Sequence, residues 1–379
     1  MSSVLLICEL CMGMGHLSRT SRLAEALVSR FRVLLVLITD MPVSLQAPDG
    51  VELRILSYAE AEAAAKKWPI ESPLHTLAHE FQPDVIGIEY FPFGRRNSKV
   101  MYLAFLMQLH RIRSPRPLLF CSVRDIQDGL SIEDRDFTVK TLNRWFDHLL
   151  IHSDERISRL EHSFPGADAI TIPIAYTHYV ARPFAPLPEA PVRGKTIVVS
   201  CGGGLAAGNL LWCAIEAAKR GLLPGHMLRL FAGNLLDEKE WTNLQRKCAG
   251  AEDIIELHRW APDLRLELLT AAASVSQFGY NTALEVLSSG VPALIVPYTS
   301  ENEPEQLVRA RAWEEHGAVR VLPREQLTAD TLAEEIQKTL RFTPNKVEVR
   351  MDGAERTCAL LWDWVTNRQP RVSSERATV

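Results

Sequence analysis

The chain has 379 residues, of which 47% are hydrophobic and 23% are charged, which is typical of a soluble globular protein with two or three domains. Its formal net charge is only −4, and both charge signs are spread along the chain, so no domain is basic enough to indicate a nucleic-acid partner. The seven cysteines are an odd number and lie mostly within apolar segments, which argues against a disulfide framework and favours a cytoplasmic protein with reduced thiols.

The first half of the chain alternates short apolar runs with segments long enough to form helices. The runs, rich in branched residues, span 4–9, 33–39, 51–56, 84–90, 117–123 and 148–152, and the predicted helices span 17–30, 59–81, 97–113 and 135–147. Nearly continuous apolar strands that alternate with helices are typical of a parallel sheet covered on both faces. We therefore predict an α/β N-terminal domain over residues 1–180.

A proline-rich segment interrupts this pattern and predicts a linker over residues 181–193. The alternation then restarts, with strands predicted at 195–204, 227–233, 253–260, 273–278 and 292–298 and helices at 205–220, 237–249, 263–272, 281–289 and 327–341. This pattern predicts a second α/β domain over 194–345. We expect residues 346–368 to form a C-terminal helix that packs back on the N-terminal domain, and residues 369–379 to form a flexible tail.

Each half begins with a strand that runs into glycines and then into a helix. The glycines are Gly13 and Gly15 beside His16 in the first half, and Gly202, Gly203 and Gly204 in the second. Glycines allow close approach of a ligand to the backbone, and the free N–H groups at a helix start attract anions. Neither loop has the spacing of a Walker phosphate loop or a dinucleotide fingerprint, and a plain strand-to-helix turn explains either loop taken alone.

The segment from Trp260 to Gln306 is more specific. In "QFGYNTALE", Gly279 lies in a predicted turn, Asn281 and Thr282 supply polar atoms at a helix start, and Glu285 follows one turn later. Such polar atoms either cap the helix or hold a phosphate, and a carboxylate one turn further on is well placed to accept hydrogen bonds from a ribose. Taken singly, these residues read equally well as a cap and a solvated helix position.

This segment resembles the donor-binding signature of nucleotide-sugar-dependent glycosyltransferases, whose core reads "HCGWNS..E". With "WAP" upstream and "EQ" downstream, it is similar to the C-terminal domain of the two-Rossmann-domain (GT-B) glycosyltransferases, a superfamily that includes the lipid-linked N-acetylglucosaminyltransferase of peptidoglycan synthesis. A bacterial group of predicted glycosyltransferases also shares four motifs with this chain. They are "GxGHxxR" at 13–19, "FPFGRR" at 91–96, "RDI" at 124–126 and "EQLxRA" at 305–310.

The resemblance implies a fold of two Rossmann-like domains that face each other across a cleft, and it implies roles for the donor-site residues. Glu285 would hold the ribose, Asn281 and Thr282 with the 202–204 loop would hold the diphosphate, and Trp260 would lie against the base. Glu305 and Gln306 would face the donor sugar. Gln277 departs from the family, because many relatives have a phosphate-binding histidine there, so Arg19 or a helix dipole would have to supply the missing charge. Asp263 also departs from the glutamine of plant relatives.

His16 follows a strand of the first sheet, at the edge where open α/β sheets bind ligands. An inverting sugar transfer needs a base for the acceptor hydroxyl, and a neutral imidazole suits that role at neutral pH. In the resembling families the histidine of this loop is assigned it. A carboxylate would orient the ring; Asp125 and Glu89 both follow strands, and the sequence does not choose between them. The plainer interpretation is a histidine that only caps the turn.

Arg19 and Arg22 lie one turn apart, so they either meet a diphosphate or an acidic acceptor, or form a solvated face. The region 95–116 is basic around an apolar helix, which is typical of a buried helix with basic ends or of a membrane-surface dock for a lipid-linked acceptor. "EDRD" at 133–136 lies in a predicted helix, and Cys8 and Cys11 form a CxxC without a second pair. We expect neither to bind a metal.

The sequence therefore predicts a metal-independent glycosyltransferase without a resident cofactor, which moves a sugar from a nucleoside-diphosphate donor, with a UDP-sugar favoured, to a small-molecule or lipid-linked acceptor. Two alternatives stay open: a nucleotide-sugar hydrolase whose histidine activates water, and a non-catalytic nucleotide-sugar binding protein. The N-terminal run is too short for a membrane span and has no basic leader. We expect a cytoplasmic protein, at the inner face of the membrane if the acceptor is lipid-linked. The sequence does not specify the oligomeric state.

Overall fold

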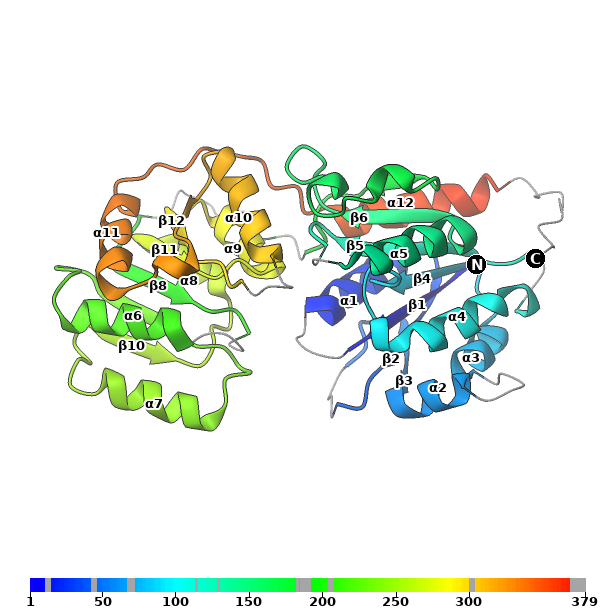
Figure 1. Ribbon diagram of the computed structural model, residues 1–379, viewed down its shortest axis with the longest axis horizontal. Coiled ribbons are helices and arrows are strands. Elements are labelled where there is room, and N and C mark those ends of the chain that lie inside the picture. The colour runs from blue at the N-terminus through cyan, green and yellow to red at the C-terminus, as the bar shows by residue number, and fades with distance from the viewer. Residues whose placement is uncertain are drawn as a thin grey trace.

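Apolar runs of the chain form the strands of two separate parallel sheets. The computed structural model describes all residues except 11–14, 42–45, 67–71, 113–114, 128–129, 182–183, 185–191, 204–207, 300–303 and 369–379. The two sheets, each with its covering helices, lie side by side as two α/β domains (Figure 1).

The N-terminal sheet has the strand order β3-β2-β1-β4-β5-β6-β7, and all its pairings are parallel. Its strands are β1 (Ser3–Glu9), β2 (Arg32–Ile38), β3 (Val51–Leu56), β4 (Val85–Glu89), β5 (Leu118–Arg124), β6 (His148–His152) and β7 (Ile174–Tyr176). Its helices are α1 (Gly15–Leu27), α2 (Tyr58–Ala65), α3 (Pro73–Phe81), α4 (Lys99–Met107) and α5 (Ile132–Trp145). Every residue of β1 is buried, as expected for a strand covered on both faces.

The C-terminal sheet has the order β10-β9-β8-β11-β12-β13, again with parallel pairings only. Its strands are β8 (Thr196–Ser200), β9 (Met227–Phe231), β10 (Ile255–His258), β11 (Ala273–Ser276), β12 (Ala293–Ile295) and β13 (Arg320–Val321). Its helices are α6 (Gly208–Lys219), α7 (Glu238–Cys248), α8 (Leu264–Thr270), α9 (Tyr280–Ser289), α10 (Glu305–Glu315) and α11 (Ala329–Thr339). In both sheets the strand order therefore reverses beside the first strand, between β1 and β4 and between β8 and β11, where open α/β sheets place ligands.

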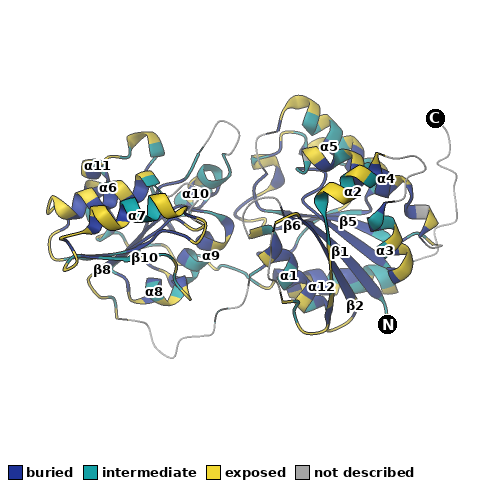
Figure 2. Ribbon diagram, turned by 90° about the horizontal axis from the view of Figure 1, so that it is seen from below, coloured by how far each residue is buried: buried dark blue, intermediate teal, exposed yellow. Residues whose placement is uncertain are grey.

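The core follows the apolar pattern of the sequence. Strands of both sheets are buried, while helices such as α6, α7 and α11 turn exposed residues away from the sheet (Figure 2). Short polar side chains fix several helix starts: Ser131 accepts a hydrogen bond from Asp134 N (3.2 Å), and Asp237 accepts one from Glu240 N (2.8 Å). These contacts satisfy N–H groups that have no partner inside the helix.

Several elements differ from the sequence-based expectation, among them β7, which was not predicted as a strand. The region predicted as one helix over 59–81 contains two, α2 and α3, and Pro73 is the first residue of α3, where its fixed backbone angle is favourable. α10 and β13 were not predicted as elements. α10 buries a charged residue, Arg309, along with Ala310 and Trp313, so its buried face does not read as an apolar stripe.

The last helix, α12 (Gly353–Thr366), packs against α1 of the N-terminal domain. Just before it, Asp352 pairs with Val180 in an antiparallel bridge, and the Tyr179 N–H donates to Arg350 O (3.0 Å). The chain thus crosses between the domains twice, and residues 179–180 lie beside residues 350–352 at this crossing. Most of the predicted linker and the whole predicted tail lie outside the described residues.

Candidate functional site

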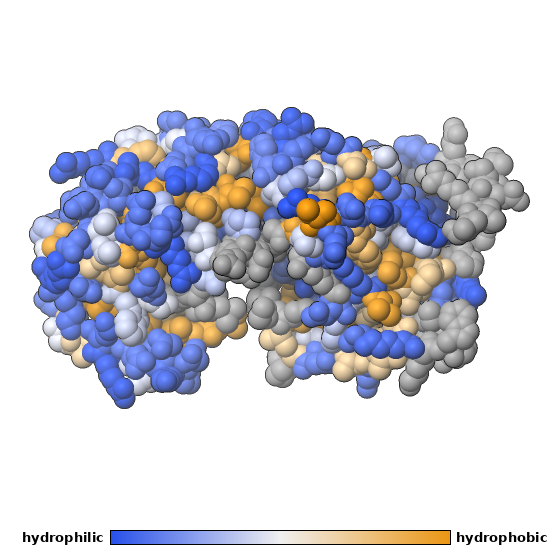
Figure 3. All heavy atoms as spheres, in the orientation of Figure 1, coloured by the Kyte–Doolittle hydropathy of each residue, from blue (hydrophilic) through white to orange (hydrophobic). Residues whose placement is uncertain are grey.

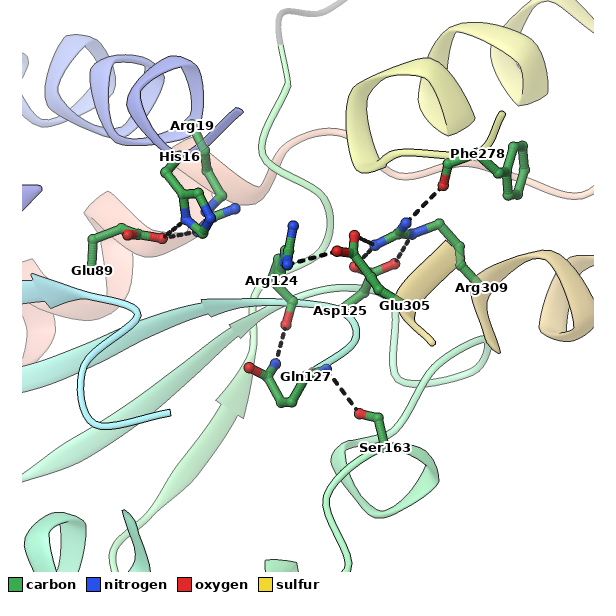
Figure 4. A network of polar contacts seen from close by, with 10 residues as sticks. All are labelled: His16, Arg19, Glu89, Arg124, Asp125, Gln127, Ser163, Phe278, Glu305 and Arg309. Atoms are coloured by element: carbon green, nitrogen blue, oxygen red, sulfur yellow. Dashed lines mark hydrogen bonds and ion pairs between the residues drawn. The ribbon is translucent and has the colours of Figure 1, made fainter. Parts of the chain in front are cut away.

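His16 and Glu89 meet at the carboxyl edge of the N-terminal sheet. His16 is in the first turn of α1, which follows β1, and Glu89 is the last residue of the neighbouring strand β4. The His16 Nδ1 atom lies 2.6 Å from Glu89 Oε1 (Figure 4). An ionised carboxylate only accepts hydrogen bonds, so Nδ1 carries the proton and Nε2 keeps a lone pair. The His16 side chain is 16% exposed, which leaves it accessible at this edge.

The charge of Glu89 is held by a cluster of donors. Besides His16, the buried carboxylate accepts a hydrogen bond from Arg19 and one from Arg95 Nη2 (3.0 Å). Burial raises the pKa of Glu89, but the attraction of His16 and Arg19 outweighs it and holds the pKa well below its usual range. Burial lowers the pKa of His16 below 6.5, and the attraction of Glu89 offsets only part of that effect. His16 is therefore a neutral imidazole at neutral pH.

Asp125, the other carboxylate that the sequence offered as a partner of His16, has a different partner. Its carboxylate receives two hydrogen bonds from Arg309 of α10, Nε to Oδ2 at 2.6 Å and Nη2 to Oδ1 at 2.7 Å, and both side chains are buried. In the structure Glu89, and not Asp125, is therefore the carboxylate that contacts the His16 ring. The reason is geometric: Asp125 lies one residue beyond the end of β5 and faces the C-terminal domain.

The two arginines of α1 also differ from expectation. Arg19 is buried and paired with Glu89, and its guanidinium lies 5.8 Å from the centre of the Tyr280 ring. Arg19 shares this one carboxylate with Arg95, so its guanidinium is bonded within the N-terminal domain. Arg22 contacts Glu355 of α12 and donates through Nε to Ala181 O (3.4 Å), at the crossing between the domains.

On the C-terminal side, the start of α9 lies beside the glycine loop. Gly279 is the N-cap residue of α9, and no side chain caps this helix. A Cβ atom placed on Gly202 would lie 3.6 Å from Thr282 Oγ1, so the loop after β8 and the first turn of α9 are neighbours. Gly202 has a φ of +58°, which favours glycine at this position. Asn281 is exposed on the same turn. Together these groups present backbone N–H groups and a hydroxyl with the geometry of an anion site.

Glu285 and Trp260 lie near the same helix. Burial, followed by repulsion from Asp263, raises the pKa of the half-buried Glu285 to about 7. Asp263 caps α8, where its Oδ1 accepts from Leu266 N (3.2 Å). The side chain of Trp260, three residues earlier, is 55% exposed. The structure therefore places Glu285 near Asp263 at the start of α8, and leaves the Trp260 ring that precedes α8 accessible.

Glu305 and the two glutamines have structural partners. Gln306 Oε1 accepts from the N–H groups of Phe278 and Tyr298, both at 3.0 Å, and so ties two loops together. Glu305 forms ion pairs with Arg124 of the N-terminal domain (2.6 Å) and with Arg309. Gln277 is buried and borders a narrow hollow beside Tyr298 and Arg324. These contacts compete with the sugar contacts that the resemblance implies for Glu305 and Gln306.

Three side chains at this interface were not singled out as site residues from the sequence. Arg95 contacts Glu89, Arg309 contacts Asp125, and the Tyr280 hydroxyl donates to His152 O (3.0 Å) and accepts from Val180 N (2.9 Å). Each lies in one of the motifs quoted above, "FPFGRR", "EQLxRA" or "QFGYNTALE". These motifs could have identified the three residues as candidates from the sequence. The predicted donor residues Gly13 and Gly204 lie outside the described residues.

Other features of the described residues bear on the remaining expectations. No group of three or more His, Cys, Asp or Glu side chains in the described ranges is arranged to hold a metal ion. No helix of that part of the chain is long and apolar enough to cross a membrane. α4 buries most of its apolar side chains and exposes Val100 and Met107, while Lys99 pairs with Asp134 (2.7 Å). The face of the molecule shown in Figure 3 is largely hydrophilic, with smaller groups of apolar residues in both domains.

Comparison with known sequences places the C-terminal region. Residues 226–357 match the family model for the glycosyltransferase family 28 C-terminal domain. The chain is also similar to UDP-N-acetylglucosamine--N-acetylmuramyl-(pentapeptide) pyrophosphoryl-undecaprenol N-acetylglucosamine transferases. The enzyme of Nitrosomonas eutropha is 28% identical over 207 residues, 49% of this chain and 57% of the relative. That of Legionella pneumophila is 24% identical over 151 residues, 40% of this chain and 39% of the relative. The matches thus span about half of each curated relative or less.

Solved structures agree on the architecture over nearly the whole chain. The glycotransferase of kitacinnamycin superposes with a TM-score of 0.63 at 17% identity and covers 95% of this chain and 98% of its own. MurG of Acinetobacter baumannii superposes with a TM-score of 0.62 at 14% identity, over 95% of this chain and 99% of its own. The predicted fold class, two Rossmann-like domains of the GT-B type, is confirmed. Within that fold, residues 226–357 are similar to the family 28 C-terminal domain.

Proposed function

We propose that this chain, which combines the GT-B fold with a family 28 C-terminal domain, transfers a sugar from a nucleoside diphosphate to an acceptor hydroxyl with inversion at the anomeric carbon. The observation that carries the proposal is the His16–Glu89 pair, 2.6 Å apart, at the sheet edge that faces the C-terminal domain. The uncapped α9 start and the glycine loop lie on the other side. A base and an anion site on facing edges are what such a transfer requires.

In the proposed reaction His16 Nε2 removes the proton of the acceptor hydroxyl as its oxygen attacks the anomeric carbon. A bond forms between that oxygen and the carbon, the bond to the diphosphate oxygen breaks, and the proton stays on His16. Glu89 holds the ring through Nδ1 and stabilises the imidazolium that forms. Burial keeps His16 neutral beforehand, so the base is available at pH 7.

Backbone groups stabilise the negative charge that develops on the leaving diphosphate. Gly202, Gly203 and the first turn of α9, with Asn281 and Thr282, offer N–H donors and the positive end of a helix dipole. The cations at the facing edge are already paired, Arg19 with Glu89 and Arg309 with Asp125. Glu285 receives the ribose hydroxyls and Trp260 stacks on the base. We favour a UDP-sugar because the similar curated proteins are named for UDP-N-acetylglucosamine.

The acceptor is proposed as a hydroxyl-bearing molecule, either small or lipid-linked. The relatives' names specify a pyrophosphoryl-undecaprenol acceptor. If the acceptor of this protein is also lipid-linked, the protein works in the cytoplasm at the inner face of the membrane and makes peripheral contact with it. Flotation with liposomes that carry a polyprenyl diphosphate sugar, compared with plain liposomes, separates the two acceptor classes.

The proposal is tested first by binding and then by turnover. UDP, GDP, dTDP and their sugars are compared by thermal shift, because a ligand of the native state raises Tm. UDP-sugars should give the largest shift, and Glu285→Ala should remove it. With a hydroxyl acceptor, His16→Ala should lower kcat by about 10²- to 10⁴-fold while the UDP shift remains. His226→Ala, a histidine of the other domain bonded only to Pro224 O, is the matched control.

Two outcomes would contradict the proposal. Stoichiometric release of free sugar without acceptor, at the rate measured with acceptor, would identify a hydrolase in which His16 activates water. Unchanged activity of His16→Ala, with ligand binding lost only in Glu285→Ala, would indicate a binding protein. Inversion is checked from the anomeric configuration of the product by NMR.

A further inference from the structure

Two sequence motifs separated by about 180 residues meet across the domains. "RDI" follows β5 of the N-terminal domain and "EQLVRA" starts α10 of the C-terminal domain. Each motif contributes one basic and one acidic side chain to the contact. Arg124 Nη2 lies 2.6 Å from Glu305 Oε2, and the Arg309 guanidinium binds both Asp125 oxygens (Figure 4). We call these four residues, Arg124, Asp125, Glu305 and Arg309, the interdomain clamp.

The inner pair of the clamp is fully enclosed. Arg309 is 2% exposed and Asp125 is 1% exposed. Removing two charges from water is costly, and an apolar pair of similar size holds two surfaces together at least as well. What a bidentate arginine–carboxylate pair adds is direction, since two parallel hydrogen bonds fix both distance and orientation. The inner pair therefore sets how the domains are oriented and not merely that they touch.

Arg309 also holds the donor-side turn. Its Nη1 donates to Phe278 O (2.7 Å), and the next turn residue, Gly279, is the N-cap of α9. The Phe278 N–H is held by Gln306 Oε1 (3.0 Å), also from α10. The turn that leads into the proposed diphosphate site is thus fixed from both backbone sides by α10. Arg309 binds Asp125 with its other two nitrogens, so the same side chain holds both the turn before α9 and the contact between the domains.

The clamp is connected to the edge that carries the base. Asp125 follows β5 directly, and Ser122 of β5 is in register with Glu89 of β4, the partner of His16. Tyr280 supplies a second link, since its hydroxyl donates to His152 O (3.0 Å) at the end of β6. A continuous set of bonds therefore runs from the start of α9 to His16, and it crosses between the domains at the clamp and at Tyr280.

We propose that Arg309 and Asp125 are positioning residues that fix the donor-side turn relative to His16 and so set the geometry of sugar transfer. This inference rests on the proposed function. Neither residue touches the reacting atoms. Arg124 and Glu305 support the inner pair from its more accessible side, and Glu305 acts through Arg309 and not by holding the donor sugar.

The test compares Arg309→Gln, Asp125→Asn and the double variant in the full chain. We expect each single variant to lower kcat on the order of 10- to 100-fold, with a donor KM within about threefold of the native value, because misplacement of about 1 Å between donor and base is costly. The double variant should lose no more than the worse single variant, because the residues act as one pair. Arg116→Gln, which breaks a bidentate pair with Asp147 (2.8 and 2.9 Å) inside one domain, is the control.

A second measurement does not depend on activity. Fluorophores are attached through introduced unnatural residues at the exposed positions Glu133 of α5 and Lys239 of α7, one in each domain. In the ligand-free protein, the interdomain distance distribution should broaden in Arg309→Gln and stay native in Arg116→Gln. If the inner-pair variants do not fold, Arg124→Gln, which alters a partly accessible side chain, should broaden it to a smaller extent.

A native distance distribution in the folded clamp variants would overturn the inference, as would additive losses in the double variant. So would a fall in Tm with unchanged kcat, which is what a purely structural ion pair predicts. If the native protein shows no transferase activity but the distances broaden, the proposed function fails while the clamp stands as a domain-orienting device.

Discussion

The two sheet edges that face each other hold charge in opposite ways. At the N-terminal edge a buried carboxylate, Glu89, is surrounded by His16, Arg19 and Arg95, and every one of these groups points its donor at it. At the C-terminal edge the glycine loop and the start of α9 are not capped by a side chain. The first edge therefore relies on charged side chains, whereas the second offers the backbone N–H groups of a helix start.

This difference suits the two tasks proposed for the edges. A base must have its tautomer and protonation state set before the acceptor arrives, and a ring of fixed charges does that without reorganisation. A diphosphate is already negatively charged, so the dipoles of backbone N–H groups suffice to bind it. A further cation would slow the release of the nucleoside diphosphate product. Disturbing the N-terminal edge should therefore change chemistry, and disturbing the C-terminal edge should change binding.

The largest effect is expected from Glu89→Gln. Without its carboxylate partner His16 loses its orientation, and Arg19 and Arg95 are left as buried cations beside it. We expect kcat to fall about 100-fold or more while UDP affinity stays within twofold. Since the charge of Glu89 raises the pKa of His16, its loss should also move the acidic limb of the kcat/KM profile to lower pH.

Asp147→Asn is the matched control for this prediction, because Asp147 is also a buried, arginine-paired carboxylate but lies away from the cleft. An equal loss of kcat in both variants, or an acidic limb that moves to higher pH, would show that Glu89 only stabilises the fold. Calorimetric titration with UDP measures whether the UDP affinity of the variants stays within twofold of the native value.

A moderate effect is expected at Glu285, whose pKa of about 7 makes donor binding depend on pH. Ribose hydroxyls favour the carboxylate form, so donor affinity should fall about tenfold between pH 8 and pH 6, and Glu285→Gln should bind weakly at both. Glu335→Gln, which removes a carboxylate with a lowered pKa in the same domain, should keep the native profile.

Glu285 also makes a prediction for stability. Its folded pKa lies above the unfolded value of 4.5, so the unfolding free energy falls as pH rises from about 4.5 through 7. Glu285→Gln should therefore raise Tm at pH 8 more than at pH 5. A lower Tm of Glu285→Gln than of the native protein at pH 8 would mean that the Glu285 carboxylate is stabilised in the ligand-free protein. That result would contradict a carboxylate that gains its hydrogen-bond partners only from the ligand.

The smallest effect is expected from Trp260→Ala. Its side chain is more than half exposed, so the unfolding free energy should stay within about 0.5 kcal/mol of native. Loss of stacking on the base should weaken UDP binding by about fivefold, which calorimetry measures. Trp212→Ala, at an exposed tryptophan that packs against Lys247, should leave UDP binding unchanged.

The fold was predictable from the sequence because its strands are buried on both faces and read as apolar runs, as "VLLICE" and "VLLVLIT" do. α10 was not, because Arg309 occupies its buried face, and the bidentate partner of that arginine is a carboxylate 184 residues away. The bond between Arg309 and Asp125 also explains why Asp125 is not the partner of His16. Glu89 is the last residue of β4, and Asp125 follows β5 of the same sheet. Asp125 is bonded to Arg309 of the other domain, and that contact cannot be read from the local sequence.

The paired crossing between the domains has a consequence for dissecting the protein. Because α12 packs on α1, the described chain returns to the N-terminal domain after the C-terminal one, which is therefore an insertion between β7 and α12. Val180 and Asp352, which flank the insertion, are antiparallel neighbours. A chain that joins residue 180 to residue 352 through a two-residue turn would close the N-terminal domain as one continuous piece. The His16 edge can then be titrated without the donor domain.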